Sequence, residues 1–138
     1  TLDYFYNSFQ YIDYFFPNLE EGMYFSGKED LDAICDFFIN KGIKTVVLKL
    51  GDQGCLVKSK QERLHVPAFK IEPLDTTGSG DNFAAGFISA ILENLDLEKA
   101  AIRANATGCM TAQHIGAESG YCNLAEVFDF ITKNTTSL

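Results

Sequence analysis

The stretch DTTGSGDNFAAGF, residues 75–87, places flexible glycines directly before a helical pattern. Phe83, Phe87 and Ile91 recur every four residues and predict a helix that runs to about Leu95. Glycine at a helix start costs conformational entropy and packs nothing, so stability gives a poor reason for it. Because the first amides of a helix are unpaired and partly positive, glycines there let an anion approach the backbone.

The amides of Gly78, Ser79 and Gly80 therefore form a candidate cradle for a phosphate or a developing negative charge. Two other phosphate-binding motifs do not fit this stretch. A Walker loop requires a Lys-Ser or Lys-Thr pair after its glycines, and none follows here. The dinucleotide fingerprint requires a third glycine at the position of Phe83.

Asp81 follows this cradle, and the residues alone leave two interpretations open. A carboxylate in the first turn of a helix is stabilised by the dipole, by a few tenths to about 1 kcal/mol. However, it also repels a bound phosphate, which argues against a purely structural acid. An acid beside a transferring phosphoryl group can orient an attacking hydroxyl and accept its proton, as in kinases.

The rest of the chain predicts alternating strands and helices. SGKE, residues 26–29, matches a capping box and predicts a helix that Gly42 ends. TVVLKL, residues 45–50, is typical of a strand buried on both faces in a parallel sheet, and residues 54–59 and 63–69 predict a hairpin. These patterns indicate an α/β layered domain.

Two further helices are predicted after the glycine loop. The first is rich in small residues and runs from Leu97 to His114. The second begins at a cap formed by Asn123 and Glu126, and its inner stripe is predicted to be Leu124, Val127, Phe128 and Ile131. At the other end, the first sixteen residues hold more aromatic area than one helical face usually hides, so we expect them to pack against further chain.

Composition excludes several classes of function. The formal charge of −8 and the lack of a basic patch argue against nucleic-acid binding. No stretch approaches the roughly 20 apolar residues that span a bilayer, so we expect no membrane partner. The four cysteines, Cys35, Cys55, Cys109 and Cys122, show no metal-binding spacing and favour buried reduced thiols in a cytoplasmic protein.

Residues 75–87 resemble the C-terminal signature of the ribokinase-like (pfkB) carbohydrate kinases, D-T-x-[GA]-[SA]-G-D-x-F-x-x-G-[FL], at every position. In that family the second Asp of the signature is the catalytic base and the residues before it form an anion hole. The resemblance implies that Asp81 is the base and that Gly78, Ser79 and Gly80 hold the γ-phosphate charge in the transition state.

PNLEEG, residues 17–22, resembles the N-x-x-E motif of the family and implies that Asn18 and Glu21 place Mg²⁺, mostly through water. The alternative is that Asn18 caps a turn and Glu21 is a solvated acid. KLGDQG, residues 49–54, resembles the nucleotide loop of the family, commonly T-L-G-x-x-G. It would supply Lys49, Gly51 and Gly54, although Lys49 replaces the commoner Thr, and the glycines could be ordinary turn residues.

NATGCMTAQHIGAESG, residues 105–120, resembles the adenine-side helix and the loop after it, so Asn105 would lie near the adenine of ATP. The alternative is tight packing between helices through small residues. Many members also bind a monovalent cation such as K⁺ beside the anion hole, mainly through carbonyls. The corresponding positions are Asp75, Thr77, Thr111, His114 and Gly116.

The resemblance implies a three-layer α/β/α ribokinase-like sandwich with a mostly parallel sheet, of which residues 1–138 form the C-terminal ATP-binding and catalytic portion. The sugar-binding N-terminal half and its lid, through which a homodimer could form, have no counterpart in the sequence. The expected function is ATP-dependent phosphoryl transfer to a hydroxyl of a small carbohydrate. A nucleoside or sugar-phosphate kinase and a catalytically silent nucleotide-binding module remain the alternatives.

Overall fold

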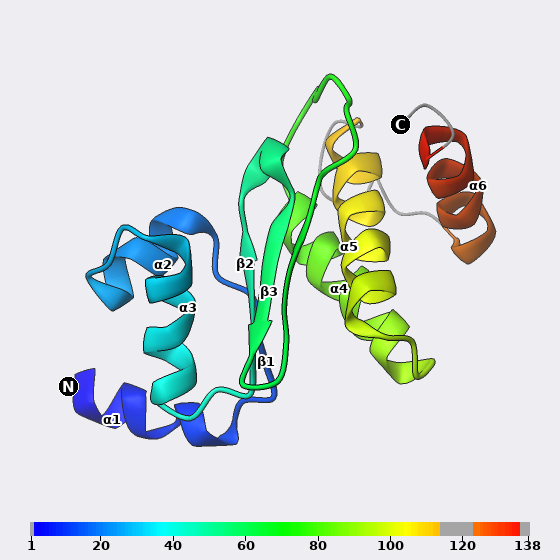
Figure 1. Ribbon diagram of the computed structural model, residues 1–138. Coiled ribbons are helices and arrows are strands. Elements are labelled where there is room, and N and C mark those ends of the chain that lie inside the picture. The colour runs from blue at the N-terminus through cyan, green and yellow to red at the C-terminus, as the bar shows by residue number, and fades with distance from the viewer. Residues whose placement is uncertain (1, 114–122, 136–138) are drawn as a thin grey trace. The chain divides into compact units, whose positions relative to one another are not determined.

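The computed structural model describes residues 2–113 and 123–135 (Figure 1). The chain forms two compact units, and each is described by itself. The first consists of residues 1–51 and 55–65. The second consists of residues 52–54 and 66–138. No helix in the part of the chain that the structure describes is long and apolar enough to cross a membrane.

The first unit contains a four-stranded sheet in the order β1-β2-β3-β4. The strands are β1 (Tyr14–Phe15), β2 (Thr45–Lys49), β3 (Cys55–Ser59) and β4 (Arg63–Val66). β1 and β2 are parallel, with Tyr14 opposite Thr45, whereas β2 and β3 are antiparallel. The expected sheet was mostly parallel, but the described one is mixed. Residues 50–54, between β2 and β3, are too few for the crossover that a parallel pair needs.

Helices of the first unit lie beside this sheet (Figure 1). They are α1 (Leu2–Asn7), α2 (Leu19–Ser26) and α3 (Leu31–Asn40), with the short 3-10 turn η1 (Phe9–Tyr11). A second 3-10 turn, η2 (Gly51–Gln53), lies where the chain passes from the first unit to the second. The sequence did not predict α1 and α2. The predicted capping box at Ser26 is wrong, because Ser26 ends α2. Asp30 caps α3 instead, where its Oδ2 accepts the Ala33 amide at 2.9 Å.

One hydrophobic core holds the first unit together. It is formed by α3, by β2 and β3, and by the aromatic N-terminal segment. Its buried members are Phe9, Ile34, Cys35, Phe38, Ile39, Ile43, Val46, Leu48 and Leu56. Phe9 contacts the rings of Phe5 and Phe38, so much of the aromatic area packs within this unit. Tyr4 and Tyr11 remain 82% and 80% exposed.

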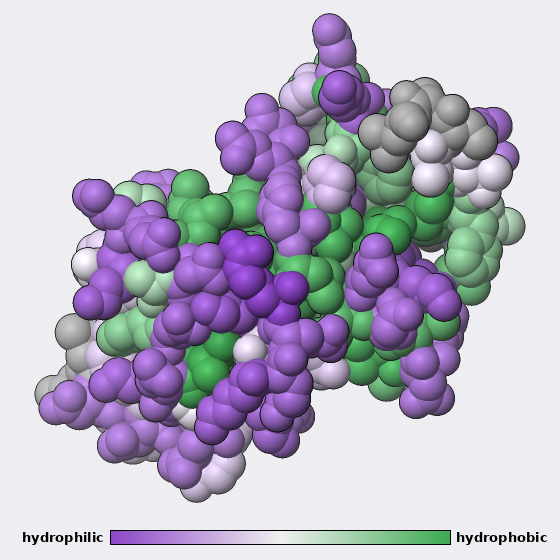
Figure 2. All heavy atoms as spheres, in the orientation of Figure 1, coloured by the Kyte–Doolittle hydropathy of each residue, from purple (hydrophilic) through white to green (hydrophobic). Residues whose placement is uncertain are grey.

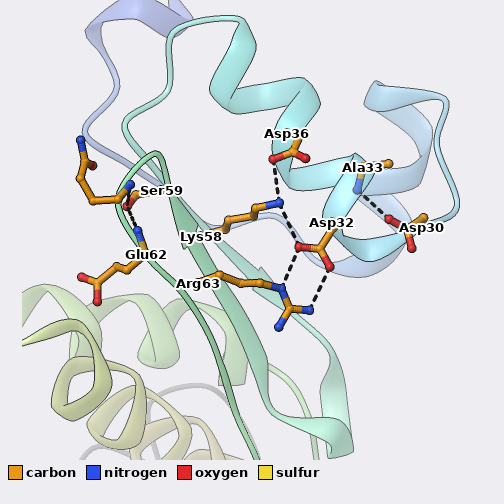
Figure 3. Close-up of polar contacts among 9 residues, drawn as sticks. Asp30, Asp32, Ala33, Asp36, Lys58, Ser59, Glu62 and Arg63 are labelled. Atoms are coloured by element: carbon orange, nitrogen blue, oxygen red, sulfur yellow. Dashed lines mark hydrogen bonds and ion pairs between the residues drawn. The ribbon is translucent and has the colours of Figure 1, made fainter.

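Four charged side chains join α3 to β3 and β4 (Figure 3). Lys58 pairs with Asp32 at 2.9 Å and with Asp36 at 2.8 Å. Arg63 donates two hydrogen bonds to Asp32, at 2.8 and 2.9 Å. The hydrogen bonds from Arg63 and Lys58 hold the pKa of Asp32 well below its usual range. This cluster anchors the hairpin to the helix from the solvent side.

The second unit contains α4 (Ser79–Leu92), α5 (Leu97–Ala112) and α6 (Leu124–Thr135). α4 and α5 pack against each other through Phe83, Phe87 and the alanines of α5. The predicted cap of α6 is confirmed, because the side chains of Asn123 and Glu126 accept each other's backbone amides at 3.0 Å. Of the predicted inner stripe of α6, Val127 is buried, whereas Phe128 is 50% exposed. Accordingly, hydrophobic residues are visible on the surface over α6 in Figure 2.

The described cysteines are free thiols. Cys35, Cys55 and Cys109 form no disulfide in the described chain. Burial raises the pKa of the Cys35 and Cys55 thiols to about 12, so both remain protonated and unreactive. Cys109 is partly buried, and Cys122 lies outside the described residues.

Candidate active site

The glycine loop leads directly into α4. Gly78 is the N-cap in the left-handed conformation (φ +75°), which favours glycine. The Asn82 amide donates to the Gly78 carbonyl at 3.0 Å and is the first to enter the helical pattern. The amides of Gly80 and Asp81 therefore have no intrahelical acceptor. The Ser79 amide donates to the Thr76 carbonyl at 3.1 Å, so one of the three predicted donors is already engaged in the turn.

Asp81 lies in the first turn of α4 with an exposed side chain. No described residue donates a side-chain hydrogen bond to its carboxylate, and the carboxylate makes no ion pair within residues 2–113 and 123–135. It therefore faces solvent beside the amides of the helix start. This geometry suits a base that receives an incoming hydroxyl, and it is equally compatible with an acid that only stabilises the helix dipole.

The segment before the loop is attached to the end of α5. The amides of Leu74 and Asp75 both donate to the Ala112 carbonyl, at 2.7 and 3.0 Å. Asp75 Oδ1 in turn accepts the Thr77 amide at 2.9 Å. Of the predicted cation positions, the structure thus brings Asp75 and Thr77 near the turn of α5 that carries Thr111. His114 and Gly116 lie outside the described residues.

Asn105 is buried in α5 with 5% of its surface exposed. Its Nδ2 donates to the carbonyls of Val66 and Pro67, at 3.3 and 3.1 Å. Gly54, predicted in the nucleotide loop, packs on the same backbone. It has φ +87°, and a Cβ there would lie 2.7 Å from Ala68 N. The structure thus links Asn105 and Gly54 through residues 66–68, a connection that the sequence did not reveal.

The other predicted residues lie in the first unit. Asn18 and Glu21 form a capping box at the start of α2, with Asn18 Oδ1 accepting the Glu21 amide at 2.8 Å and Glu21 Oε2 accepting the Asn18 amide at 2.9 Å. Asn18 follows the end of β1, and it forms an isolated parallel bridge with Lys49, the last residue of β2. Asn18, Glu21 and Lys49 therefore gather at the carboxyl edge of a parallel strand pair, where α/β proteins bind ligands.

The oxygen donors at this edge suit an ion that keeps most of its water. Glu21 uses one carboxylate oxygen in the cap, so the other is available to a metal-bound water. Across the described residues, no three His, Cys, Asp or Glu side chains gather into a metal-binding cluster. Mg²⁺ is commonly held in this sparse way, by one or two protein groups and substrate phosphates. The residues therefore fit indirect Mg²⁺ binding.

The sequence did not single out Asn82 and Thr107, which lie beside the glycine loop, and it did not reveal their side-chain hydrogen bonds in the network that contains the predicted cation residue Thr111. Asn82 Nδ2 donates to Thr111 Oγ1 at 2.7 Å, and Thr107 Oγ1 donates to the Asn82 carbonyl at 2.8 Å. Thr107 and Thr111 are four residues apart, which places both hydroxyls on one face of α5. That spacing was the only signal in the sequence.

Known proteins resemble this chain in sequence and in fold. Residues 2–123 match the pfkB family carbohydrate kinases. The chain is 32% identical over 125 residues to 2-dehydro-3-deoxygluconokinase of Bacillus subtilis, covering 90% of this chain and 39% of the relative. The crystal structure of ribokinase from Thermotoga maritima superposes with a TM-score of 0.84 at 35% identity, over 90% of this chain and 43% of that one.

A further structure, described as a ribokinase II from Escherichia coli, was solved with ATP and Mg²⁺. It gives a TM-score of 0.88 at 28% identity, over 96% of this chain and 43% of that one. The fold is therefore the α/β fold of ribokinases, as the sequence predicted. The chain belongs to the pfkB family of carbohydrate kinases. It spans about two fifths of the length of the relatives it matches.

Proposed function

We propose that the full-length protein transfers the γ-phosphoryl group of ATP to a hydroxyl of a small carbohydrate. The observation that carries this proposal is the exposed carboxylate of Asp81 beside the open amides of the α4 start, in a chain of this family. Relatives that act as kinases on 2-dehydro-3-deoxygluconate and ribose, by their names, support a carbohydrate acceptor.

In this mechanism each residue has one task. Asp81 accepts the proton of the acceptor hydroxyl as its oxygen attacks the γ-phosphorus in line. The amides of Gly80 and Asp81, at the positive end of α4, stabilise the charge that builds on the transferring group. The turn that contains Gly78 and Ser79 holds these amides in place. Because the attack is direct, no phosphorylated form of the enzyme arises.

The nucleotide would be bound by Lys49 and by the loop that contains Gly51 and Gly54, with Asn105 supporting that loop from α5. Asn18 and Glu21 would hold Mg²⁺ through water, and the ion would neutralise phosphate charge. Asp75, Thr77, Thr111, His114 and Gly116 would surround a monovalent cation such as K⁺. The oxygen donors of Asp75 and Thr77, close to the end of α5, fit such an ion.

The test uses the full-length protein. Calorimetric titration with ATP and Mg²⁺ measures nucleotide binding, and a radiolabelled ATP assay against sugars, nucleosides and sugar phosphates measures transfer. We expect nucleotide binding and transfer to at least one sugar. Transfer only to a nucleoside or a sugar phosphate would show that the acceptor is not a simple sugar and would contradict that part of the proposal. Nucleotide binding without transfer to any acceptor would contradict the proposal and support a silent module.

A further inference from the structure

Asn82, the residue after Asp81, is hydrogen-bonded to α5 through both its side chain and its main chain. Asn82 Nδ2 donates to Thr111 Oγ1 at 2.7 Å. The Asn82 carbonyl accepts from Thr107 Oγ1 at 2.8 Å. Thr111 Oγ1 donates to the Thr107 carbonyl at 2.8 Å, which closes a network of three residues. The first turn of α4 is thereby fixed to two successive turns of α5.

The donors and acceptors at the Thr111 hydroxyl leave little freedom, whereas the proton of the Thr107 hydroxyl is shared between the carbonyls of Asn82 and Ala104, at 2.8 and 3.0 Å. A threonine hydroxyl has one proton, and that of Thr111 is directed at the Thr107 carbonyl. Its lone pair is then the acceptor for the amide of Asn82. Thr111 is fully buried, so water does not replace this acceptor. The hydroxyl, rather than the bulk of the side chain, is what the network requires at this position.

Close contact between the helices supports the same arrangement. A Cβ on Gly86 of α4 would overlap Thr107 Oγ1 and lie 3.0 Å from Thr107 Cγ2. A Cβ on Gly108 of α5 would lie 3.3 Å from the Ser79 carbonyl. The Ala112 carbonyl binds the amides of Leu74 and Asp75 on the other side of the loop. Residues 107–112 of α5 therefore anchor the chain both before and after Gly78–Asp81.

We propose that Asn82, Thr107 and Thr111 are positioning residues, which set the place of Asp81 and of the α4 amides for phosphoryl transfer. This inference rests on the proposed function. A shift of about 1 Å in a reacting group can cost roughly 100-fold in rate, so a network that fixes this turn acts on turnover. It acts less on ATP affinity, because the proposed nucleotide contacts of Lys49, Gly51 and Gly54 lie in other segments.

The experiment compares Thr111→Val with Thr111→Ser in the full-length protein. Valine keeps the shape and the backbone carbonyl of Thr111 but removes the hydroxyl, whereas serine keeps the hydroxyl. We expect Thr111→Val to lower kcat at least tenfold while KM for ATP changes less than about threefold. Thr111→Ser keeps the hydroxyl, so its kcat should be at least about threefold higher than that of Thr111→Val. Equal losses in the two variants would overturn the proposal.

Thr132→Val is the matched control. It makes the same chemical change on α6, at a threonine whose hydroxyl donates to the Phe128 carbonyl at 2.9 Å. It should leave kcat unchanged. Asn82→Ala removes the side-chain amide that donates to Thr111, and it replaces Thr111→Val as the test variant if Thr111→Val does not fold. Because Thr111→Val and Asn82→Ala break the same hydrogen bond, kcat of the double variant should be no lower than that of the worse single variant. A loss of kcat equal to the product of the two single losses would contradict the network.

A second measurement does not depend on activity. Hydrogen exchange at the amides of residues 82–85 should accelerate at least tenfold in Thr111→Val and stay unchanged in Thr132→Val. Failure of the unsubstituted protein to transfer phosphate refutes the proposed function and with it the catalytic role of the network. Unchanged kcat and unchanged exchange in Thr111→Val, in an active protein, refute the positioning role alone.

Discussion

Replacing Gly86 by alanine tests how tightly α4 and α5 are packed beside the candidate active site. On an exposed helix this substitution stabilises by about 1 kcal/mol, because alanine is the better helix former. In this structure the new Cβ would overlap Thr107 Oγ1, which donates to the Asn82 carbonyl. Overpacking typically costs about 1–3 kcal/mol, and a broken hydrogen bond about 1 kcal/mol more.

The loss therefore exceeds the gain, and we expect Gly86→Ala to lower the free energy of unfolding by about 1–3 kcal/mol. Urea unfolding of the full-length protein, followed by circular dichroism, measures this change. The double variant Gly86→Ala with Thr107→Ala removes the overlapping atoms. This double variant should regain much of the free energy of unfolding, but its kcat should stay low, because the Thr107 hydroxyl that binds the Asn82 carbonyl is absent. A Gly86→Ala protein as stable as the original would refute the packing described here.

Two further predictions concern the nucleotide loop and the charged cluster. Gly54→Ala should weaken ATP binding at least tenfold in a calorimetric titration, because φ +87° disfavours alanine and the new Cβ would meet the backbone of residues 66–68. Gly51→Ala should weaken ATP binding less, because its Cβ would meet no atom within 4 Å, although φ there is +62°. A larger loss of ATP affinity in Gly51→Ala than in Gly54→Ala would contradict the role of that backbone contact. Arg63→Gln should lower the free energy of unfolding only slightly at neutral pH, since the pair is partly exposed. The lowered pKa of Asp32 means that this stabilisation is present above the ordinary aspartate pKa, about 3.9, and is lost as the pH falls below it. In urea unfolding, the difference in the free energy of unfolding between Arg63→Gln and the original protein should therefore be smaller at pH 3 than at pH 7. An equal difference at both pH values would refute the stabilising role of the Arg63–Asp32 pair.

Much of the fold could be predicted from local patterns. The apolar run of β2, the hairpin of β3 and β4, and the periodicity of α4 and α5 are each contained in one short segment. The short helix α2 was missed, although Asn18 and Glu21 match a capping box, because the same residues were interpreted only as a family motif or a turn. The cap of α3 was assigned to Ser26 because SGKE fits the pattern, yet Asp30 directly precedes the first apolar residue of that helix.

The candidate site was predictable only where it is local in sequence. The glycine loop and Asp81 are contiguous, and the structure places them at the start of α4 as expected. The bond between Asn82 and Thr111 joins residues 29 positions apart, and it depends on how two helices pack. The two hydrogen bonds of Asn105 to residues 66 and 67 depend on packing in the same way. No local pattern encodes such contacts.

The central claim is that Asp81 is the base for phosphoryl transfer, and the most direct test is Asp81→Asn in the full-length protein. The matched control is Asp96→Asn, which removes the same charge at the start of α5, where asparagine also caps well. We predict that kcat falls about 10²–10⁴-fold in Asp81→Asn while ATP affinity is retained, and that Asp96→Asn keeps full turnover. Full turnover in Asp81→Asn would contradict the account.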